Sequence, residues 1–284
     1  MKSKCLKVIA FLLVCILVLF SGCSTGSLSL TGSEKNTYDV SENEATVKSV
    51  PNKSSVTEIV IPDEYEGVPV TKIDDFAAVN LEYVKNIKIG KNVKTIGDWA
   101  FANNQQLVAF EVDPENQYFC SVDGVLFTKD MKTLISYPIK KGVTIVKDKD
   151  NNEVEASEYT IPDGVETIRS KAFYKCRTIQ KLTFPASVKS IEEKAFFRCE
   201  QLEDFVLPNG IQQIGKDAFS YCTKLTTLTI PKSIIAIGDY AFYSCTALLN
   251  ITVMKAEADI TLGEKWYPTN NGIKIDECNI VFKP

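Results

Sequence analysis

The chain has 284 residues, 45% of them hydrophobic and 24% charged, a composition typical of a protein that buries a core. Its formal charge is −4 and no stretch is dense in Lys or Arg, which argues against nucleic acid or anionic lipid as the partner. Histidine is absent, so nucleophilic catalysis by a Ser-His or Cys-His pair is excluded.

Residues 1–22 have the features of a secretory signal peptide. Three lysines precede an unbroken apolar run at residues 8–20, which is too short to span a bilayer as a helix. The segment Phe20-Ser21-Gly22-Cys23 resembles a bacterial lipobox. That resemblance implies lipidation of Cys23, which would anchor the mature chain to the membrane. A plain secretory signal, with Cys23 incidental, is the alternative.

Residues 23–50 are expected to form a lipidated flexible tether. Ser, Thr, Gly, Asn and Glu dominate this segment, and no apolar periodicity runs through it. After cleavage, 29 basic residues face 36 acidic ones, so the formal charge of the mature chain is −7.

An internal repeat decides the predicted fold of residues 51–253. Four copies share the frame I-P-x-x-V-x-x-I-x-x-x-A-F-x-x-C-x-x-L-x-x-L-x-L, and every step between them is 23 residues. Weaker copies begin upstream, near Val56 and Val93. The phenylalanines and cysteines of the frame are the predicted repeat core: Phe173, Cys176, Phe196, Cys199, Phe219, Cys222, Phe242 and Cys245.

Each copy reads as one coil. Leu-x-x-Leu-x-Leu predicts a short strand with alternate residues inward, and the following proline ends it because proline cannot donate to the ladder. Ala-Phe-x-x-Cys predicts a turn of helix. Because no coil buries its apolar face alone, neighbouring coils stack. The prediction is an α+β repeat solenoid of about six 23-residue coils, with a parallel β-sheet on one face and short helical turns.

The motif resembles the BspA-type leucine-rich repeats of bacterial surface proteins, and it is almost intact at residues 230–248. The resemblance covers roughly residues 56–253. It implies a leucine-rich-repeat solenoid on a cell-surface lipoprotein that attaches to host proteins, matrix or other microbes. Residues 254–284 lack the frame and are expected to cap the solenoid.

The register of the repeat breaks between about residues 113 and 158. Asp123-Gly124 and Lys129-Asp130 are turn signals between alternating apolar residues. This pattern predicts one β-hairpin inserted on one face of the solenoid.

The cysteines and the acidic clusters are candidates for metal or redox sites. The repeat cysteines lack the C-x₂₋₄-C spacing of a zinc site, and the family resemblance implies buried structural thiols, with disulfides or metal binding as alternatives. Asp148, Asp150 and Asn152 hint at a calcium loop, but Glu153 and Tyr159 occupy its glycine and glutamate positions. No metal, cofactor or catalytic residue is therefore predicted.

Two surfaces remain as candidates for ligand binding. The first is the outward side of the predicted strands: Lys181, Thr183, Asp204, Val206, Thr227, Thr229, Asn250 and Thr252. The second is an aromatic stripe next to the repeat phenylalanines, which either packs between coils or forms an exposed anchor row: Tyr174, Phe197, Tyr221 and Tyr243.

The sequence predicts a monomeric, lipid-anchored binding or adhesion module at the cell surface that recognises a protein or a glycan. The alternative is a structural or accessory envelope lipoprotein that binds a bacterial partner, and a carboxylate-dependent hydrolase is a residual one. Membrane contact is expected through the lipid only. An exposed aromatic stripe would favour that stripe as the contact surface, whereas a buried one would leave the strand side.

Overall fold

The computed structural model describes residues 35–283 except 149, 271–272 and 275–277. All of these residues belong to one compact unit, which runs from Gly32 to Pro284. The predicted signal peptide, Cys23 and the first part of the predicted tether lie outside the described residues.

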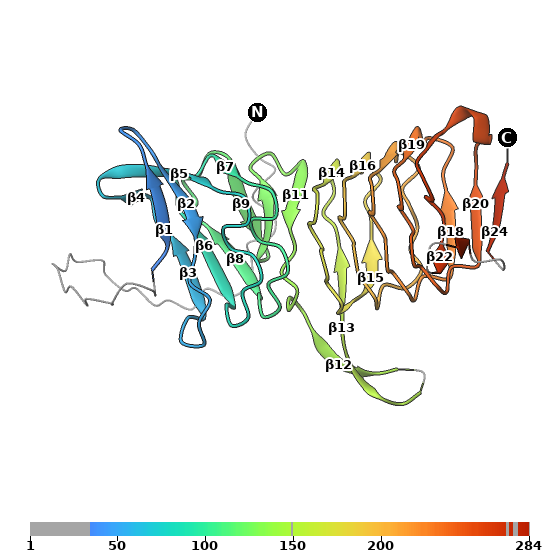
Figure 1. Cartoon of the computed structure of the whole chain (residues 1–284), viewed down its shortest axis with the longest axis horizontal. Coiled ribbons are helices and arrows are strands. Elements are labelled where there is room, and N and C mark those ends of the chain that lie inside the picture. Colours follow the sequence, from blue (N-terminus) through green and yellow to red (C-terminus); the bar gives the residue numbers. More distant parts are fainter. Residues whose placement is uncertain (1–34, 149, 271–272, 275–277, 284) are drawn as a thin grey trace, which may run out of the picture. The chain divides into compact units, whose positions relative to one another are not determined.

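The chain winds into a β-solenoid of about nine coils of about 23 residues (Figure 1). The solenoid and its repeat length are as predicted, but the number of coils exceeds the six expected from the motif. Irregular copies also complete coils, because a strand needs only alternate inward apolar residues to join the ladder.

One side of the coils carries parallel strands of four to eight residues. In β18, for example, buried Leu228 and Ile230 alternate with exposed Thr227 and Thr229. The outward side of these strands, with residues 202–207, is called the strand face below. Its strands form three groups: β3 (Glu58–Ile61), β6 (Asn86–Ile89) and β8 (Ala109–Val112); β13 (Glu153–Thr160) and β15 (Ile179–Thr183); β18 (Thr227–Ile230), β20 (Asn250–Val253) and β24 (Asn279–Phe282).

A second ladder, which the sequence did not predict as a sheet, runs along the Val-x-x-Ile part of the coils. Most of its strands have two residues, and Ile191, Ile214 and Ile237 pair in register one coil apart. Eight strands form the main sheet: β21 (Thr261–Leu262), β19 (Ala236–Ile237), β17 (Gln213–Ile214), β16 (Ser190–Ile191), β14 (Thr167–Ile168), β11 (Thr133–Ser136), β10 (Val125–Thr128) and β9 (Phe119–Val122). Nearer the N-terminus, β5 (Val68–Ile73) pairs with β7 (Thr95–Ile96) in the same way.

The predicted helical turns are wrong. The described residues contain no α-helix, and their one helical element is the 3₁₀ turn η1 (Glu257–Asp259). A left-handed residue lies just before each Ala-Phe-x-x-Cys segment and another lies within it, such as Lys171 (φ 62°) and Lys175 (φ 56°), and a right-handed helix cannot accommodate them. Alternate N–H groups bond to the next coil instead, as from Phe173 to the Ala195 carbonyl at 2.8 Å.

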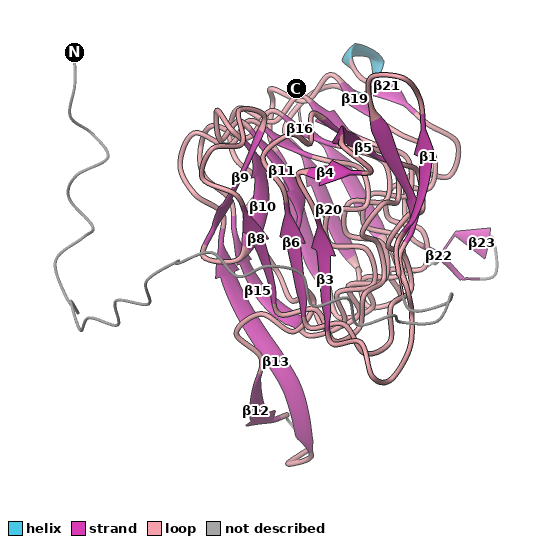
Figure 2. Cartoon of the chain, turned by 90° about the vertical axis from the view of Figure 1, so that its left-hand side faces the viewer, coloured by secondary structure: helices cyan, strands magenta, loops and turns pink. Residues whose placement is uncertain are grey.

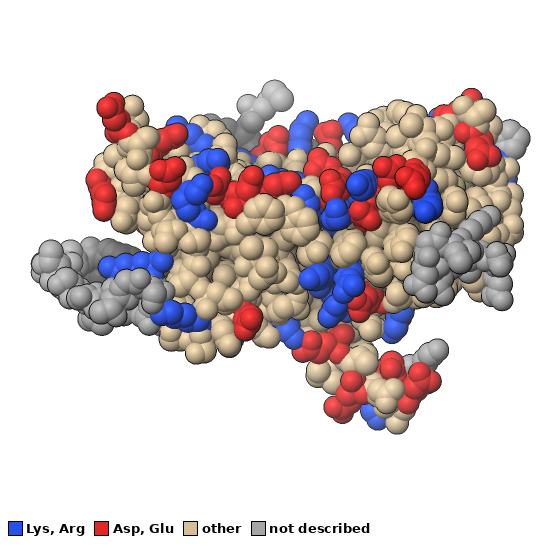
Figure 3. Space-filling model, in the orientation of Figure 1, with Lys and Arg blue, Asp and Glu red and all other residues tan. Residues whose placement is uncertain are grey.

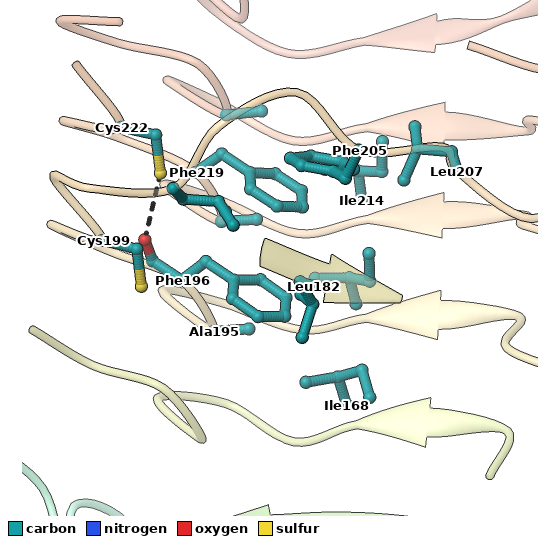
Figure 4. Close-up of a cluster of buried hydrophobic side chains, with 14 of the residues drawn as sticks. Ile168, Leu182, Ala195, Phe196, Cys199, Phe205, Leu207, Ile214, Phe219 and Cys222 are labelled. Carbon is teal, nitrogen blue, oxygen red and sulfur yellow. Dashed lines mark hydrogen bonds between the residues drawn. The ribbon is translucent and has the colours of Figure 1, made fainter. Parts of the chain in front are cut away.

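The phenylalanines of the repeat stack through the core. Phe173, Phe196, Phe219 and Phe242 are fully buried, with successive ring centroids 4.8, 5.0 and 5.5 Å apart (Figure 4). Near-parallel rings at this spacing contribute about 0.5–1.5 kcal/mol per pair beyond the area they bury. These rings fill the core between successive coils, whose spacing is set by the main-chain ladders.

The folded part of the chain begins earlier than predicted. Strands β1 (Thr37–Val40) and β2 (Ala45–Ser49) form a hairpin, and β2 pairs with β5; β4 (Glu64–Tyr65) pairs with the other edge of β5 (Figure 2). Residues 37–49 therefore belong to the fold and not to a flexible tether. Ala45 and Val47 are fully buried and cover the core of the first coil.

The interrupted segment contains a three-stranded antiparallel meander, β9–β10–β11, and a second, separate hairpin, instead of the one hairpin predicted. Strands β9 and β10 meet at Asp123-Gly124, where both residues have positive φ, as a tight two-residue hairpin requires. Together with β11 they lie between two buried clusters: Leu126 faces the N-terminal cluster, and Val125 and Phe127 face the C-terminal one. Burial on both sides explains the near-continuous apolar run of β10.

The second hairpin, β12 (Thr144–Lys147) with the first half of β13, projects from the coils (Figure 1). The predicted cap also contributes to the coils, because β21 and β24 extend both ladders. It contains a short antiparallel pair as well, β22 (Thr269–Asn270) and β23 (Ile273–Lys274).

Candidate binding surfaces

Seven of the eight side chains predicted on the strand face are exposed, and Thr252 is half-buried. They point outward because they alternate with buried Leu182, Leu228 and Ile251. Their surroundings are mixed in charge: Lys181 Nζ lies 2.8 Å from Glu158 Oε1 in the preceding coil. On the face shown in Figure 3, basic and acidic side chains are interspersed as well.

Asp204 and Thr227 are bonded to each other and not free for a ligand. Asp204 Oδ1 accepts the N–H groups of Thr226 and Thr227 at 2.7 and 3.0 Å, and Oδ2 accepts both hydroxyls at 2.7 and 2.9 Å. Partial burial raises the pKa of Asp204, but these hydrogen bonds outweigh it and hold the pKa below its ordinary value.

Residues 202–207 are irregular, although they carry the repeat motif. No strand is assigned to them, whereas β15 and β18 occupy this place in the flanking coils. Phe205 stands where those coils have Leu182 and Leu228, and its ring packs on Phe219 at 5.1 Å between centroids (Figure 4). Val206 occupies the outward position that follows this ring and is 84% exposed.

A groove lies beside this irregular segment, with a volume of about 1050 Å³. We call it the Val206 groove. Its lining joins the irregular segment to the ends of β18 and β20 and to the C-terminal region: Asp204, Phe205, Val206, Leu207, Asn209, Thr227, Thr229, Pro231, Lys232, Met254, Lys255, Ala256, Asp259 and Lys283. Sequence reasoning missed the groove because the lining residues from 254 to 283 lie outside the repeat frame.

A second groove, of about 750 Å³, separates the projecting hairpin from the strand face. Lys147, Asp148 and Asp150 line one side of it, and Lys181 and Lys224 line the other. Acidic side chains gather on the hairpin (Figure 3). Asp148 Oδ1 accepts N–H groups of Asp150 and Asn152, so this carboxylate organises the turn of the hairpin.

The residues of the predicted aromatic stripe form one contiguous row of rings. Tyr174, Phe197, Tyr221 and Tyr243 are half-buried and contact one another at centroid distances of 5.2, 5.4 and 5.6 Å. Trp99 adds to the row, 4.7 Å from Tyr174. It comes before an Ala-Phe pair, whereas Tyr174 follows one, so the frame gave no signal that Trp99 would join the row.

The ring faces of this aromatic row are largely occupied. Tyr174 and Phe197 stack at an interplanar angle of 7°, and the guanidinium of Arg198 lies 5.0 Å from the centroid of Tyr221. Lys171 Nζ lies 4.7 Å from the centroid of Trp99. The row therefore packs mainly against itself and offers ring edges to solvent.

The repeat cysteines are fully buried and form no disulfide. Three thiols donate to the phenylalanine carbonyl of the preceding coil, as from Cys222 Sγ to Phe196 O at 3.4 Å (Figure 4). Burial raises the pKa of Cys176 to about 11, which keeps it a protonated, weakly nucleophilic thiol at neutral pH. Among the described residues, no cluster of Cys, Asp or Glu could hold a metal ion.

No described helix has the length and apolar character needed to cross a bilayer.

Stacked coils, parallel ladders and one inward motif per coil define a leucine-rich-repeat solenoid. The family model for the BspA type leucine rich repeat region matches residues 48–148 and 144–263, in six copies. The chain belongs to the BspA-type leucine-rich-repeat family.

Solved structures share the fold. The pneumococcal vaccine antigen PcpA and a leucine-rich repeat protein from Eubacterium ventriosum each give a TM-score of 0.54 at 21% identity, over 80% and 75% of this chain. A leucine rich cell surface protein from Faecalibacterium prausnitzii gives 0.55 at 24% identity, over 77%. This chain spans 68%, 66% and 62% of theirs, about two thirds. Comparison with curated proteins finds no match.

Proposed function

We propose that the chain is a lipid-anchored cell-surface module that binds a protein partner through the strand face. The observation that carries the proposal is the exposure of its outward side chains beside two grooves, both of which include Asp204. Short polar side chains next to an apolar recess can supply both hydrogen bonds and a buried centre to an interface.

The aromatic row supports this choice by its packing. A sugar ring or a protein anchor needs a free aromatic face, and the faces of Tyr174, Phe197 and Tyr221 meet neighbouring rings or Arg198. No catalytic step is part of the proposal, because the chain has no histidine and its repeat thiols are buried.

The location at the cell surface rests on the family, on the likeness in fold to a leucine rich cell surface protein and on Cys23. Metabolic labelling with a radioactive fatty acid tests the anchor directly. We expect label on the chain and none on a Cys23→Ser variant, which should leave the cells in soluble form. Equal labelling of both proteins would contradict lipidation at Cys23.

The strand face is tested by binding of the purified chain to a panel of host matrix proteins and glycans. A Thr183→Glu/Thr229→Glu variant places two charges on the strand face, where both side chains are exposed and Thr229 lines the Val206 groove. We expect it to weaken saturable protein binding at least about tenfold.

A Gln213→Glu variant is the matched control, because Gln213 is an exposed strand residue of the second ladder. Its binding should equal that of the unaltered chain. Binding that survives on the strand-face variant would contradict the proposed surface. No binding by the folded chain would contradict host adhesion and favour a partner in the bacterium's own envelope.

A further inference from the structure

The irregular segment has main-chain groups that the protein does not use. In the described part of the chain, no main-chain hydrogen bond joins residues 204–207 to another coil. In the flanking ladders such groups pair, as between Leu228 and Ile251. Polar groups of this kind must bond to water or to a partner, so a short row of donors and acceptors is available here.

The lost pairing has two local causes. Phe205 is larger than the leucine of the neighbouring coils, and Asp204 supplies its carboxylate where a main-chain carbonyl normally serves the next coil. The normal bond is seen one coil later, from Leu249 N to Thr226 O at 3.1 Å. The interruption of the ladder is thus stabilised by a side chain, because the carboxylate of Asp204 accepts the N–H groups of Thr226 and Thr227.

The adjoining Val206 groove is lined by apolar residues and by three lysines, two of which are exposed. Val206 and Met254 are exposed, and Leu207 and Pro231 complete the apolar lining. Lys232 and Lys283 are exposed on the rim, and Lys255 is half-buried beside them, with its Nζ bonded to Ile234 O at 2.8 Å.

Acidic residues balance this charge only in part. The groove includes Asp204 and Asp259, and the Asp204 carboxylate is already occupied by four hydrogen bonds. The rim therefore favours an anionic group on the ligand.

We propose that the Val206 groove binds an extended peptide segment in which an aliphatic or aromatic residue alternates with Asp or Glu. This inference rests on the proposed function and names the chemistry of its partner. The apolar side chains cover Val206 and Met254, the carboxylates meet Lys232 and Lys283, and the peptide main chain pairs with residues 204–207. A row of four residues extends about 13 Å, so the recognised segment has about four to six residues.

The probe is a fluorescein-labelled peptide, Gly-Ser-Leu-Asp-Phe-Asp-Ser-Gly, and its binding to the purified full chain is followed by fluorescence anisotropy. The unaltered chain should bind saturably, with an affinity that falls as salt is added. Val206→Glu should weaken binding at least tenfold without affecting the fold, because Val206 is almost fully exposed. Gln213→Glu, on the second ladder, should bind as the unaltered chain does.

A charge swap makes the test specific. A Lys232→Glu/Lys283→Glu variant should lose the acidic peptide and gain binding of its analogue with Lys in place of Asp. Absence of saturable binding by the unaltered chain, or equal binding by Val206→Glu, would overturn the inference. So would equal binding of the acidic and lysine peptides.

The two proposals fail separately. If the strand-face variant loses a protein partner while the peptide fails to bind, only the peptide chemistry is wrong. If the peptide binds as expected and no panel member does, the proposed peptide site is supported and the proposed adhesion to host proteins is contradicted.

Discussion

The carboxylate of Asp204 replaces a main-chain carbonyl for Thr227 in the next coil. Oδ1 accepts the N–H of Thr227 at 3.0 Å and Oδ2 accepts its hydroxyl at 2.9 Å. Asp204 was predicted to contact a ligand. Its carboxylate instead links two neighbouring coils at residues 202–207, where the main-chain ladder is interrupted. Asp204 also lines the Val206 groove, so the stability of this coil is coupled to the shape of the groove.

Replacement of Asp204 by alanine should lower the free energy of unfolding by about 1 kcal/mol at neutral pH. The estimate is at the low end for charged hydrogen bonds because the site is solvent-exposed and screened. Urea unfolding measures it, with Asp163→Asn, an exposed acidic residue, as the control. A loss no larger than that of the control would contradict the structural role of Asp204.

The same variant should show a pH dependence. Because the folded pKa of Asp204 lies below its ordinary value, the ionised form favours the folded state. Its contribution is complete above the unfolded pKa of about 4 and is lost as the pH falls through the folded pKa. The stability difference between the unaltered chain and Asp204→Ala should therefore shrink at about pH 3.

Phe205→Leu should draw residues 203–207 back into the ladder. Leucine fits the inward position, as Leu228 shows, so the amides of residues 205 and 207 should exchange more slowly with deuterated solvent. Peptide-level hydrogen exchange measures this change, and Phe184→Leu, next to the same ring, is the control. Unchanged exchange in Phe205→Leu would show that ring size does not cause the break.

The repeat thiols should be inert in the native protein. Cys199 and Cys222 are fully buried, and the resulting desolvation raises the pKa of each thiol well above the ordinary value of a cysteine. Iodoacetamide at about pH 8 should modify half-buried Cys120 at least about tenfold faster than either, as read by peptide mass spectrometry. In denaturant all three should react alike. Native labelling of Cys199 at the rate of Cys120 would contradict a buried ladder.

The repeat frame predicts the features that recur in every coil. The 23-residue step places Phe196 and Phe219 in the core, and the alternation around Leu228 correctly gives the inward and outward sides of the strand face. It could not predict the shape of the turn, because Lys171 and Lys175 adopt positive φ for the sake of hydrogen bonds between coils, and lysine carries no signal for that conformation.

Single departures from the frame do not reveal their structural effect in the sequence. Phe205 looks like a conservative change from leucine, yet it displaces its strand because the packed core has no room for a larger ring. The Val206 groove joins that segment to Lys255 and Lys283, which are remote in the sequence and follow no period. The buried Ala45 and Val47 lie in a mostly polar stretch with few apolar residues and no repeat frame.

Lys171 lies between the two buried clusters. Its side chain is 5% exposed, its Nζ lies 2.9 Å from Asp98 Oδ2, and it sits over the ring of Trp99. Phe101, next to that pair, packs in the N-terminal cluster, and Phe173 packs in the C-terminal one. In a stack of coils, such interface contacts determine whether the halves unfold together.

Lys171→Met keeps the apolar stem but removes the ion pair and the cation–π contact, so it should lower the free energy of unfolding by about 1–2 kcal/mol. It should also broaden the urea transition, because the two clusters no longer unfold as one. Lys175→Met is the matched control, since Lys175 is half-buried and lies over Tyr174 within its own coil. A transition equally sharp in both variants would mean that β9–β11, buried on both sides, couples the clusters without help from Lys171.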